Sequence, residues 1–227
     1  MVLGKPHRVS EAVVKVAIIG PGAIGRALAK RLGHAGHDIR LSFSRDGARL
    51  RATAQELGVG FGAPAGVATW AEVIVLTTPW SALDTVIAAL GDLSGKIVWD
   101  STNAVAPDLS TMLVGTTTSV GEEVQRRARD ALVVKCIPTF AELLDGDDPR
   151  INGIPVTSYV AGNDADAKAV VCRLLADLPA TPVDVGDLTA ARLIEPMLLL
   201  LVQLAYLRGM GPKISFNLVH QEGQADG

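Results

Sequence analysis

Three glycines near the start of the chain form a Gly-x-Gly-x-x-Gly pattern directly after a short apolar run. The run covers residues 14–19, and an alanine-rich stretch of helical character follows at 24–34. In this setting the first glycine permits a tight turn, the second lets backbone approach a pyrophosphate, and the third lets the helix pack closely on the strand. We expect a dinucleotide site here, in preference to a turn without a ligand. Its residues are Gly20, Pro21, Gly22, Ala23, Ile24 and Gly25.

The position that distinguishes NAD from NADP lies about 20 residues further on, where an acidic side chain would bind a ribose hydroxyl of NAD. Ser44 and Arg45 occupy that position here, and Arg49 follows four residues later. A hydroxyl and a guanidinium can bind a phosphate, whereas a carboxylate side chain at this position would repel it. The sequence therefore favours NADP, the alternative being that these arginines are simply solvated.

The segments that must position this site alternate between short apolar runs and helical stretches, which is typical of βαβ units. Continuous apolar runs such as 73–76 indicate strands buried on both faces. The sequence predicts an α/β fold, a Rossmann-type doubly wound and mostly parallel sheet with a C-terminal helical segment. The expected strands are 14–19, 39–43, 72–78, 96–100, 131–135, 156–161 and 183–185, and the expected helices are 24–34, 46–57, 81–90, 119–129 and 165–175.

Three regions are expected along the chain. Residues 1–12 are predicted to be a flexible tail, 13–186 the NADP-binding domain, and 187–227 a C-terminal segment for dimerisation and the acceptor site. The stretch 188–208 is apolar almost all round, and a helix hydrophobic on every face must be buried. We therefore expect a homodimer. Pro196 lacks an amide donor and is expected to kink or break this helix.

Composition argues against several classes of protein. The chain has 21 basic and 24 acidic residues and no basic stripe, so nucleic-acid binding is not expected. Its 2 cysteines and 4 histidines show no metal-ligand spacing, so no metal site is expected. The N-terminus lacks the apolar core of a signal peptide, and the most apolar run, 197–207, is shorter than the ~20 residues of a membrane span. A cytoplasmic protein without membrane contact is the expectation.

Several residues at the expected strand ends could contact a ligand. Trp80 could wall a nicotinamide pocket or pack against the next helix, and Asn103 could hold a ribose or carboxamide or serve in a turn. Lys135 could face the cleft, where it would neutralise an anionic acceptor or donate a proton, although strand-end lysines commonly face solvent. Cys136 has no identifiable histidine partner and is not expected to be a nucleophile.

The sequence resembles the coenzyme F420-dependent NADP reductases over nearly its whole length after the first dozen residues. The most specific likeness is the C-terminal pair of segments 191–196 (ARLIEP) and 208–212 (RGMGP). Beside the glycine pattern and Ser44-Arg45, the similar segments are 76–80 (LTTPW), 100–103 (DSTN), 118–122 (TSVGE) and 133–135 (VVK).

This resemblance implies NADP 2′-phosphate contacts at Ser44, Arg45 and Arg49, and a ribose-nicotinamide stretch lined by Thr78 and Pro79. Two positions depart from the family pattern. Pro21 stands where well-studied members have a threonine, and Lys135-Cys136 stands where deazaflavin-using members can have a histidine.

The sequence thus predicts an enzyme, an NADP(H)-dependent oxidoreductase that passes hydride between NADP and a second redox cofactor, the deazaflavin F420. Hydride transfer between these two needs no protein base, because the chemistry belongs to the cofactors. One alternative is an NADPH-dependent reductase of another small-molecule acceptor (a flavin, ferric chelate, imine or carbonyl) with Lys135 as proton donor. The other is a non-catalytic NADPH-binding regulatory module.

Overall fold

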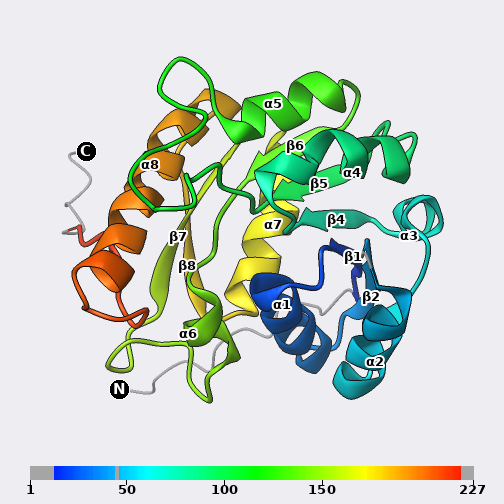
Figure 1. Ribbon diagram of the computed structural model, residues 1–227, viewed down its shortest axis with the longest axis horizontal. Helices are drawn as coiled ribbons and strands as arrows, with labels where there is room; N and C mark the ends of the chain where they lie inside the picture. The colour runs from blue at the N-terminus through cyan, green and yellow to red at the C-terminus, as the bar shows by residue number, and fades with distance from the viewer. Residues whose placement is uncertain (1–12, 44–45, 221–227) are drawn as a thin grey trace, which may run out of the picture.

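The computed structural model describes residues 13–43 and 46–220, so the expected tail at 1–12 lies outside the described residues. Their strands form one eight-stranded sheet in the order β3-β2-β1-β4-β5-β6-β7-β8 (Figure 1). Each neighbouring pair is parallel except β6 and β7, which are antiparallel. The strands are β1 (Lys15–Ile19), β2 (Asp38–Ser42), β3 (Gly60–Phe61), β4 (Val73–Leu76), β5 (Ile97–Asp100), β6 (Leu132–Lys135), β7 (Val156–Gly162) and β8 (Ala180–Asp184).

Side chains alternate between the two faces along each strand, so the apolar strands present apolar side chains on both faces of the sheet. Helices cover both faces. In β1, Val16 and Ile18 join one apolar core, and Ala17 and Ile19 join the other. The first core is closed by α1 (Ala23–His34), α2 (Gly47–Leu57), α6 (Ala141–Asp145), α7 (Ala165–Ala176) and part of α8 (Ala191–Val202). The second is closed by α3 (Pro64–Trp70), α4 (Leu83–Leu90) and α5 (Val120–Arg127), as Figure 1 shows.

This architecture confirms the predicted fold class. Each expected strand and helix is present within a few residues of its predicted bounds, with the short helix η1 (Trp80–Ala82) leading into α4. Three elements, β3, α3 and α6, were not predicted from the sequence. These elements have two, seven and five residues, too few for a hydrophobic period to be recognised.

The C-terminal helix lies at the side of the molecule away from α2 and α3 (Figure 1). It starts with η2 (Leu188–Ala190), continues as α8 and ends in a π-helical turn, η3 (Gln203–Leu207). Of the two expected effects of Pro196, a kink or a break, the break is wrong, since α8 runs through that position without interruption. Burial of Ile194 and Leu201 on either side of the proline offsets the missing hydrogen bond.

One helical stretch among the described residues, Leu188–Leu207, has the length and apolarity of a membrane span. One third of its most apolar window is buried inside the protein, and core helices of soluble proteins pass the same test. Length and composition alone therefore do not identify it as a membrane anchor. The division of the chain at residue 187 stays a prediction.

Candidate cofactor site at the carboxyl edge of the sheet

The glycine turn lies between β1 and α1, where two of its glycines are enforced by close contacts. Gly20 has φ +105, and a Cβ there would lie 2.8 Å from the Thr78 side chain. A Cβ on Gly25 would lie 2.2 Å from the carbonyl oxygen of Gly20. Thr77 fixes the same turn, because its hydroxyl lies 2.7 Å from the Gly20 carbonyl and 3.0 Å from that of Ile19. Thr77 belongs to the segment 76–80 that resembles the family, but no role in the site was predicted for it.

The second glycine is open where the other two are crowded. A Cβ on Gly22 would meet nothing within 4 Å, and both Gly22 and Ala23 are exposed. Gly22 is the N-cap of α1, and no side chain caps the helix there. The first-turn amides of this 12-residue helix are therefore directed at an open space, which is the arrangement that binds phosphate.

The residues expected to recognise the 2′-phosphate are only partly described. Ser44 and Arg45 lie outside the described residues. Arg49 is exposed near the start of α2 and lines one groove, of about 710 Å³, together with Pro21, Gly22 and Ala23. The fold thus brings the expected 2′-phosphate side chain of α2 and the glycine turn to the same groove.

Unpartnered polar atoms mark the neighbouring strand ends. In the part of the chain that the structure describes, three buried side-chain oxygens have no hydrogen-bond partner: Thr78 Oγ1, Ser101 Oγ and Asn103 Oδ1. Thr78 follows β4, the neighbour of β1, and Ser101 and Asn103 follow β5, the next strand along, so all three lie at the carboxyl edge of the parallel strands. Buried polar atoms are nearly always paired, so these three fit a polar ligand at this edge.

Trp80 packs rather than standing free at this edge. Its ring joins the apolar core beneath α3–α5, and the Arg127 guanidinium lies 5.5 Å from its centroid. Pro79 beside it is exposed. This geometry favours the packing alternative for Trp80 over a wall of the nicotinamide pocket.

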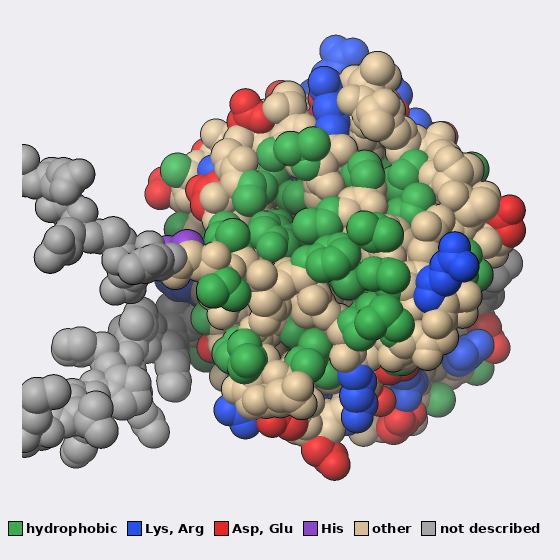
Figure 2. Space-filling view, turned by 90° about the vertical axis from the view of Figure 1, so that its left-hand side faces the viewer, with side chains coloured by type: hydrophobic (Ala, Val, Ile, Leu, Met, Phe, Trp, Pro, Cys, Tyr) green, Lys and Arg blue, Asp and Glu red, His purple; other side chains and the backbone are tan. Residues whose placement is uncertain are grey.

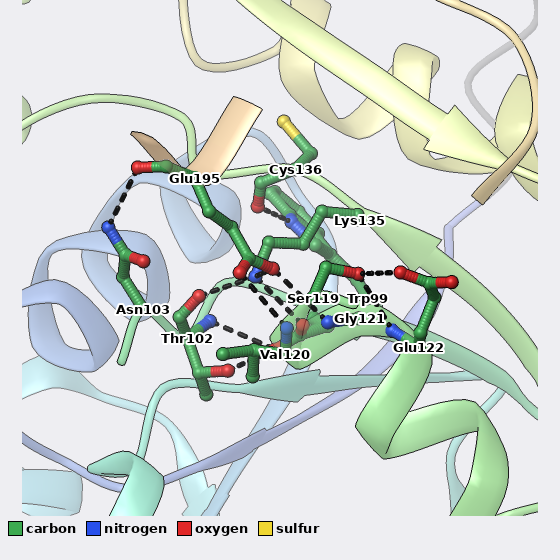
Figure 3. Close-up of polar contacts among 11 residues, drawn as sticks. Trp99, Thr102, Asn103, Ser119, Val120, Gly121, Glu122, Lys135, Cys136 and Glu195 are labelled. Carbon is green, nitrogen blue, oxygen red and sulfur yellow. Dashed lines mark hydrogen bonds and ion pairs between the residues drawn. The ribbon is translucent and has the colours of Figure 1, made fainter. Parts of the chain in front are cut away.

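Lys135 corrects the sequence analysis, because it faces neither an open cleft nor solvent. Its side chain is 0% exposed and lies between two carboxylates, with Nζ 2.9 Å from Asp100 Oδ2 and 2.9 Å from Glu195 Oε1. Figure 3 shows Lys135 beside Glu195. Nζ also donates to the carbonyl oxygen of Thr102. Neither carboxylate, one on β5 and the other on α8, was predicted from the sequence as a partner of this lysine.

Opposing effects set the charge of this lysine. Burial alone lowers the pKa of Lys135, but Asp100 and Glu195 outweigh burial and raise the pKa above its ordinary 10.5. Protonation of Lys135 therefore contributes stability that is fully present below pH 10.5 and is lost only as pH rises through the raised pKa. At neutral pH this is a permanent ammonium.

Glu195 also binds a helix end. Its carboxylate accepts from the amides of Val120, at 3.0 Å, and Gly121, at 3.2 Å, in the first turn of α5. A Cβ on Gly121 would lie 3.3 Å from the Leu188 side chain, which is a tight contact, and 3.4 Å from Ala191, so there is little room for a side chain here. The positive end of α5 thus acts as a second partner for the Glu195 charge.

Neither cysteine chemistry nor metal chemistry is supported by the described residues. Cys136 is buried, burial raises the pKa of its thiol, and its carbonyl accepts from Trp99 Nε1 at 2.8 Å. His37 pairs with Asp177, and within the described ranges no three His, Cys, Asp or Glu side chains are grouped to hold a metal ion.

A Rossmann sheet whose glycine turn opens α1 defines a class of nucleotide-dependent enzymes, and comparison with known proteins narrows it. The family model of coenzyme F420-dependent NADP oxidoreductases matches residues 15–104. A crystal structure from Arthrobacter sp. FB24, assigned as an F420-dependent NADP reductase, is 31% identical with a TM-score of 0.82, covering 91% of this chain and all of that one. The chain therefore belongs to the F420-dependent NADP oxidoreductase family, an oxidoreductase family with NADP-dependent members.

More distant similarities agree with this fold. Protein SMa0349 from Sinorhizobium meliloti is 27% identical with a TM-score of 0.72, covering 92% of this chain and 97% of that one. The NADP(+) ketol-acid reductoisomerase of Rhodococcus opacus is 42% identical over 65 residues, which are 29% of this chain and 19% of that enzyme. The match thus spans less than a fifth of the length of this curated relative.

Proposed function

We propose that the protein is an NADP(H)-dependent oxidoreductase that transfers hydride between NADP and the deazaflavin F420. The observation that carries the proposal is the open Gly22 at the uncapped start of α1, at the same edge of the sheet as the unpartnered oxygens that follow β4 and β5. Similarity across the full length of the Arthrobacter protein supports F420 as the second substrate.

The described residues fit NADP in two places. The first-turn amides of α1 would hold the pyrophosphate, with Arg49 near the 2′-phosphate. The oxygens of Thr78, Ser101 and Asn103 would bind polar atoms of the ribose-nicotinamide half. When bound, NADP(H) supplies the hydride, and the chain holds its ring in place and excludes water.

The acceptor follows from what Lys135 cannot do. Its three N–H donors are taken up by protein acceptors and its side chain is 0% exposed, so it does not reach a substrate as a proton donor. Reduction of an imine or carbonyl needs a proton, which was the role open to Lys135. Reduction of the deazaflavin also takes up one proton with the hydride, but a ring nitrogen can receive it from solvent without a protein acid, and we therefore favour F420 over those acceptors.

Spectroscopic turnover assays test this proposal. We expect the protein to oxidise NADPH when F420 is supplied, and to do so faster than with a free flavin, a ferric chelate, an imine or a carbonyl. Faster turnover with any of the other acceptors would contradict F420 as the substrate. NADPH binding without turnover of any acceptor would favour a regulatory module.

Cofactor preference gives a separate prediction. NADPH is expected to bind at least tenfold tighter than NADH, a gap of about 1.4 kcal/mol. Arg45→Ala and Arg49→Ala should each narrow the gap by weakening NADPH, because each removes a cation near the 2′-phosphate. Arg51→Ala is the control, since Arg51 lies on the same helix but stacks on Phe61. Equal wild-type affinities in calorimetry would refute the proposed preference.

A further inference from the structure

Each N–H of the Lys135 ammonium has a protein acceptor, so any effect of this side chain on a ligand must pass through its neighbours. Its three acceptors belong to Asp100, Thr102 and Glu195, which come from β5, the loop after β5 and α8. All three side chains of the ionic cluster Asp100–Lys135–Glu195 are at most 1% exposed. This buried cluster thus fastens the C-terminal helix to the carboxyl edge of the sheet.

The cluster holds the loop of residues 101–103, which carries two of the three unpartnered oxygens. Asp100 Oδ1 accepts from the Thr102 amide at 2.9 Å and from its hydroxyl at 2.5 Å, while Lys135 binds the Thr102 carbonyl. Asn103 Nδ2 lies 3.4 Å from the backbone oxygen of Glu195 (Figure 3). Both the amide and the carbonyl of Thr102 are thus held in place, and Thr102 lies between Ser101 and Asn103 in the chain.

The charges of the cluster explain why its lysine is needed. Two buried carboxylates face one ammonium, and the α5 amides on Glu195 supply roughly half a further positive charge. Without the ammonium, Asp100 and Glu195 would be two buried negative charges, and the start of α5 would be the remaining positive partner, in contact with Glu195. Breaking a buried pair from one side is strongly unfavourable, so a carboxyl would take up a proton or the loop and α8 would move, and either change alters the contacts that hold the loop.

We propose that the Asp100–Lys135–Glu195 cluster positions residues 101–103 so that Ser101 Oγ and Asn103 Oδ1 meet the nicotinamide half of NADP. Lys135 is then a positioning residue, and Glu195 makes α8 part of the cofactor site within a single chain. This inference rests on the proposed function, because it needs the cofactor at the carboxyl edge.

The experiment compares two ligands by calorimetry: NADPH, and adenosine 2′,5′-bisphosphate, which lacks the nicotinamide half. Lys135→Met is expected to weaken NADPH about tenfold or more and to change bisphosphate affinity less than about twofold. The matched control is Lys168→Met, which removes the Lys168–Asp184 ion pair on α7 and β8 and should change neither affinity. Circular dichroism checks that each variant is folded.

Glu195→Gln provides a second variant should Lys135→Met fail to fold. It keeps the shape of the side chain and the Lys135–Asp100 pair. It is expected to weaken NADPH binding selectively as well, but by only about threefold. Wild-type affinities for both ligands, or equal loss of both in a folded variant, would overturn the inference. If the wild-type protein binds neither ligand, the proposed function itself fails, and that result is distinguishable from the others.

Discussion

Gly22→Val is expected to abolish NADPH binding and leave the protein folded. The new Cβ meets no atom within 4 Å, and the Gly22 φ of −74 is one that valine adopts, so the substitution costs little in the free protein. Its methyl groups would occupy the space in front of the α1 amides, where the pyrophosphate must approach backbone. We expect NADPH to bind at least about 100-fold more weakly in calorimetry, a loss of about 2.7 kcal/mol.

Gly25→Val is the contrasting substitution within the same turn. Here Cβ would lie 2.2 Å from a backbone oxygen that cannot move without moving β1, so the folded state itself is strained. The melting temperature should fall by about 6–12 °C, corresponding to about 3 kcal/mol, whereas Gly22→Val should leave it nearly unchanged. Normal NADPH affinity in Gly22→Val would show that the turn at residues 20–25 is not the cofactor site.

The parts of the fold that could be predicted are those whose pattern lies in one contiguous stretch of sequence. The run 14–19, the glycine turn and the helix after it are contiguous, and together they define β1, α1 and the phosphate end of the site. The continuous apolar run 73–76 likewise identifies a strand buried on both faces, and β4 lies between β1 and β5. Local pattern was sufficient here because each element buries its own apolar residues.

The buried ionic cluster could not be predicted in the same way. Lys135 is 35 residues from Asp100, and Glu195 follows on a helix whose other residues are mostly apolar. A lone lysine at a strand end looks solvated unless the folded chain shows two carboxylates around it. The clue in the sequence was an acidic residue inside the segment ARLIEP, at a position that a buried helix would otherwise fill with an apolar side chain.

The homodimer predicted from the sequence remains a proposal, and the structure supplies a surface for it. On the C-terminal helix Leu193 is 75% exposed, Leu200 49% and Leu207 53%, and Met210 beyond it is 61% exposed. Figure 2 shows an apolar patch on the side of the molecule where α8 lies. At about 1.5–3 kcal/mol for each fully buried side chain, covering such residues would contribute several kcal/mol.

The spacing of these residues indicates what covers them. Leu193, Met197, Leu200 and Leu204 recur at intervals of four, three and four residues, which is the seam by which one helix packs along another. None of these four is classed as buried. A second copy of α8 related by a two-fold axis offers the same seam, so we propose that two C-terminal helices pair across the dimer interface.

Leu200→Glu is therefore expected to convert the dimer to a folded monomer, because it places a charge in the centre of this seam. Light scattering at micromolar concentration should give about twice 23.7 kDa for the wild-type protein and about 23.7 kDa for the variant. Leu201→Glu is the control one residue away. Leu201 is 8% exposed and belongs to the core, so that variant should misfold instead of dissociating. A wild-type monomer with full activity, or sedimentation of the wild-type protein with lipid vesicles, would show that the exposed face of α8 does not pair with a second copy.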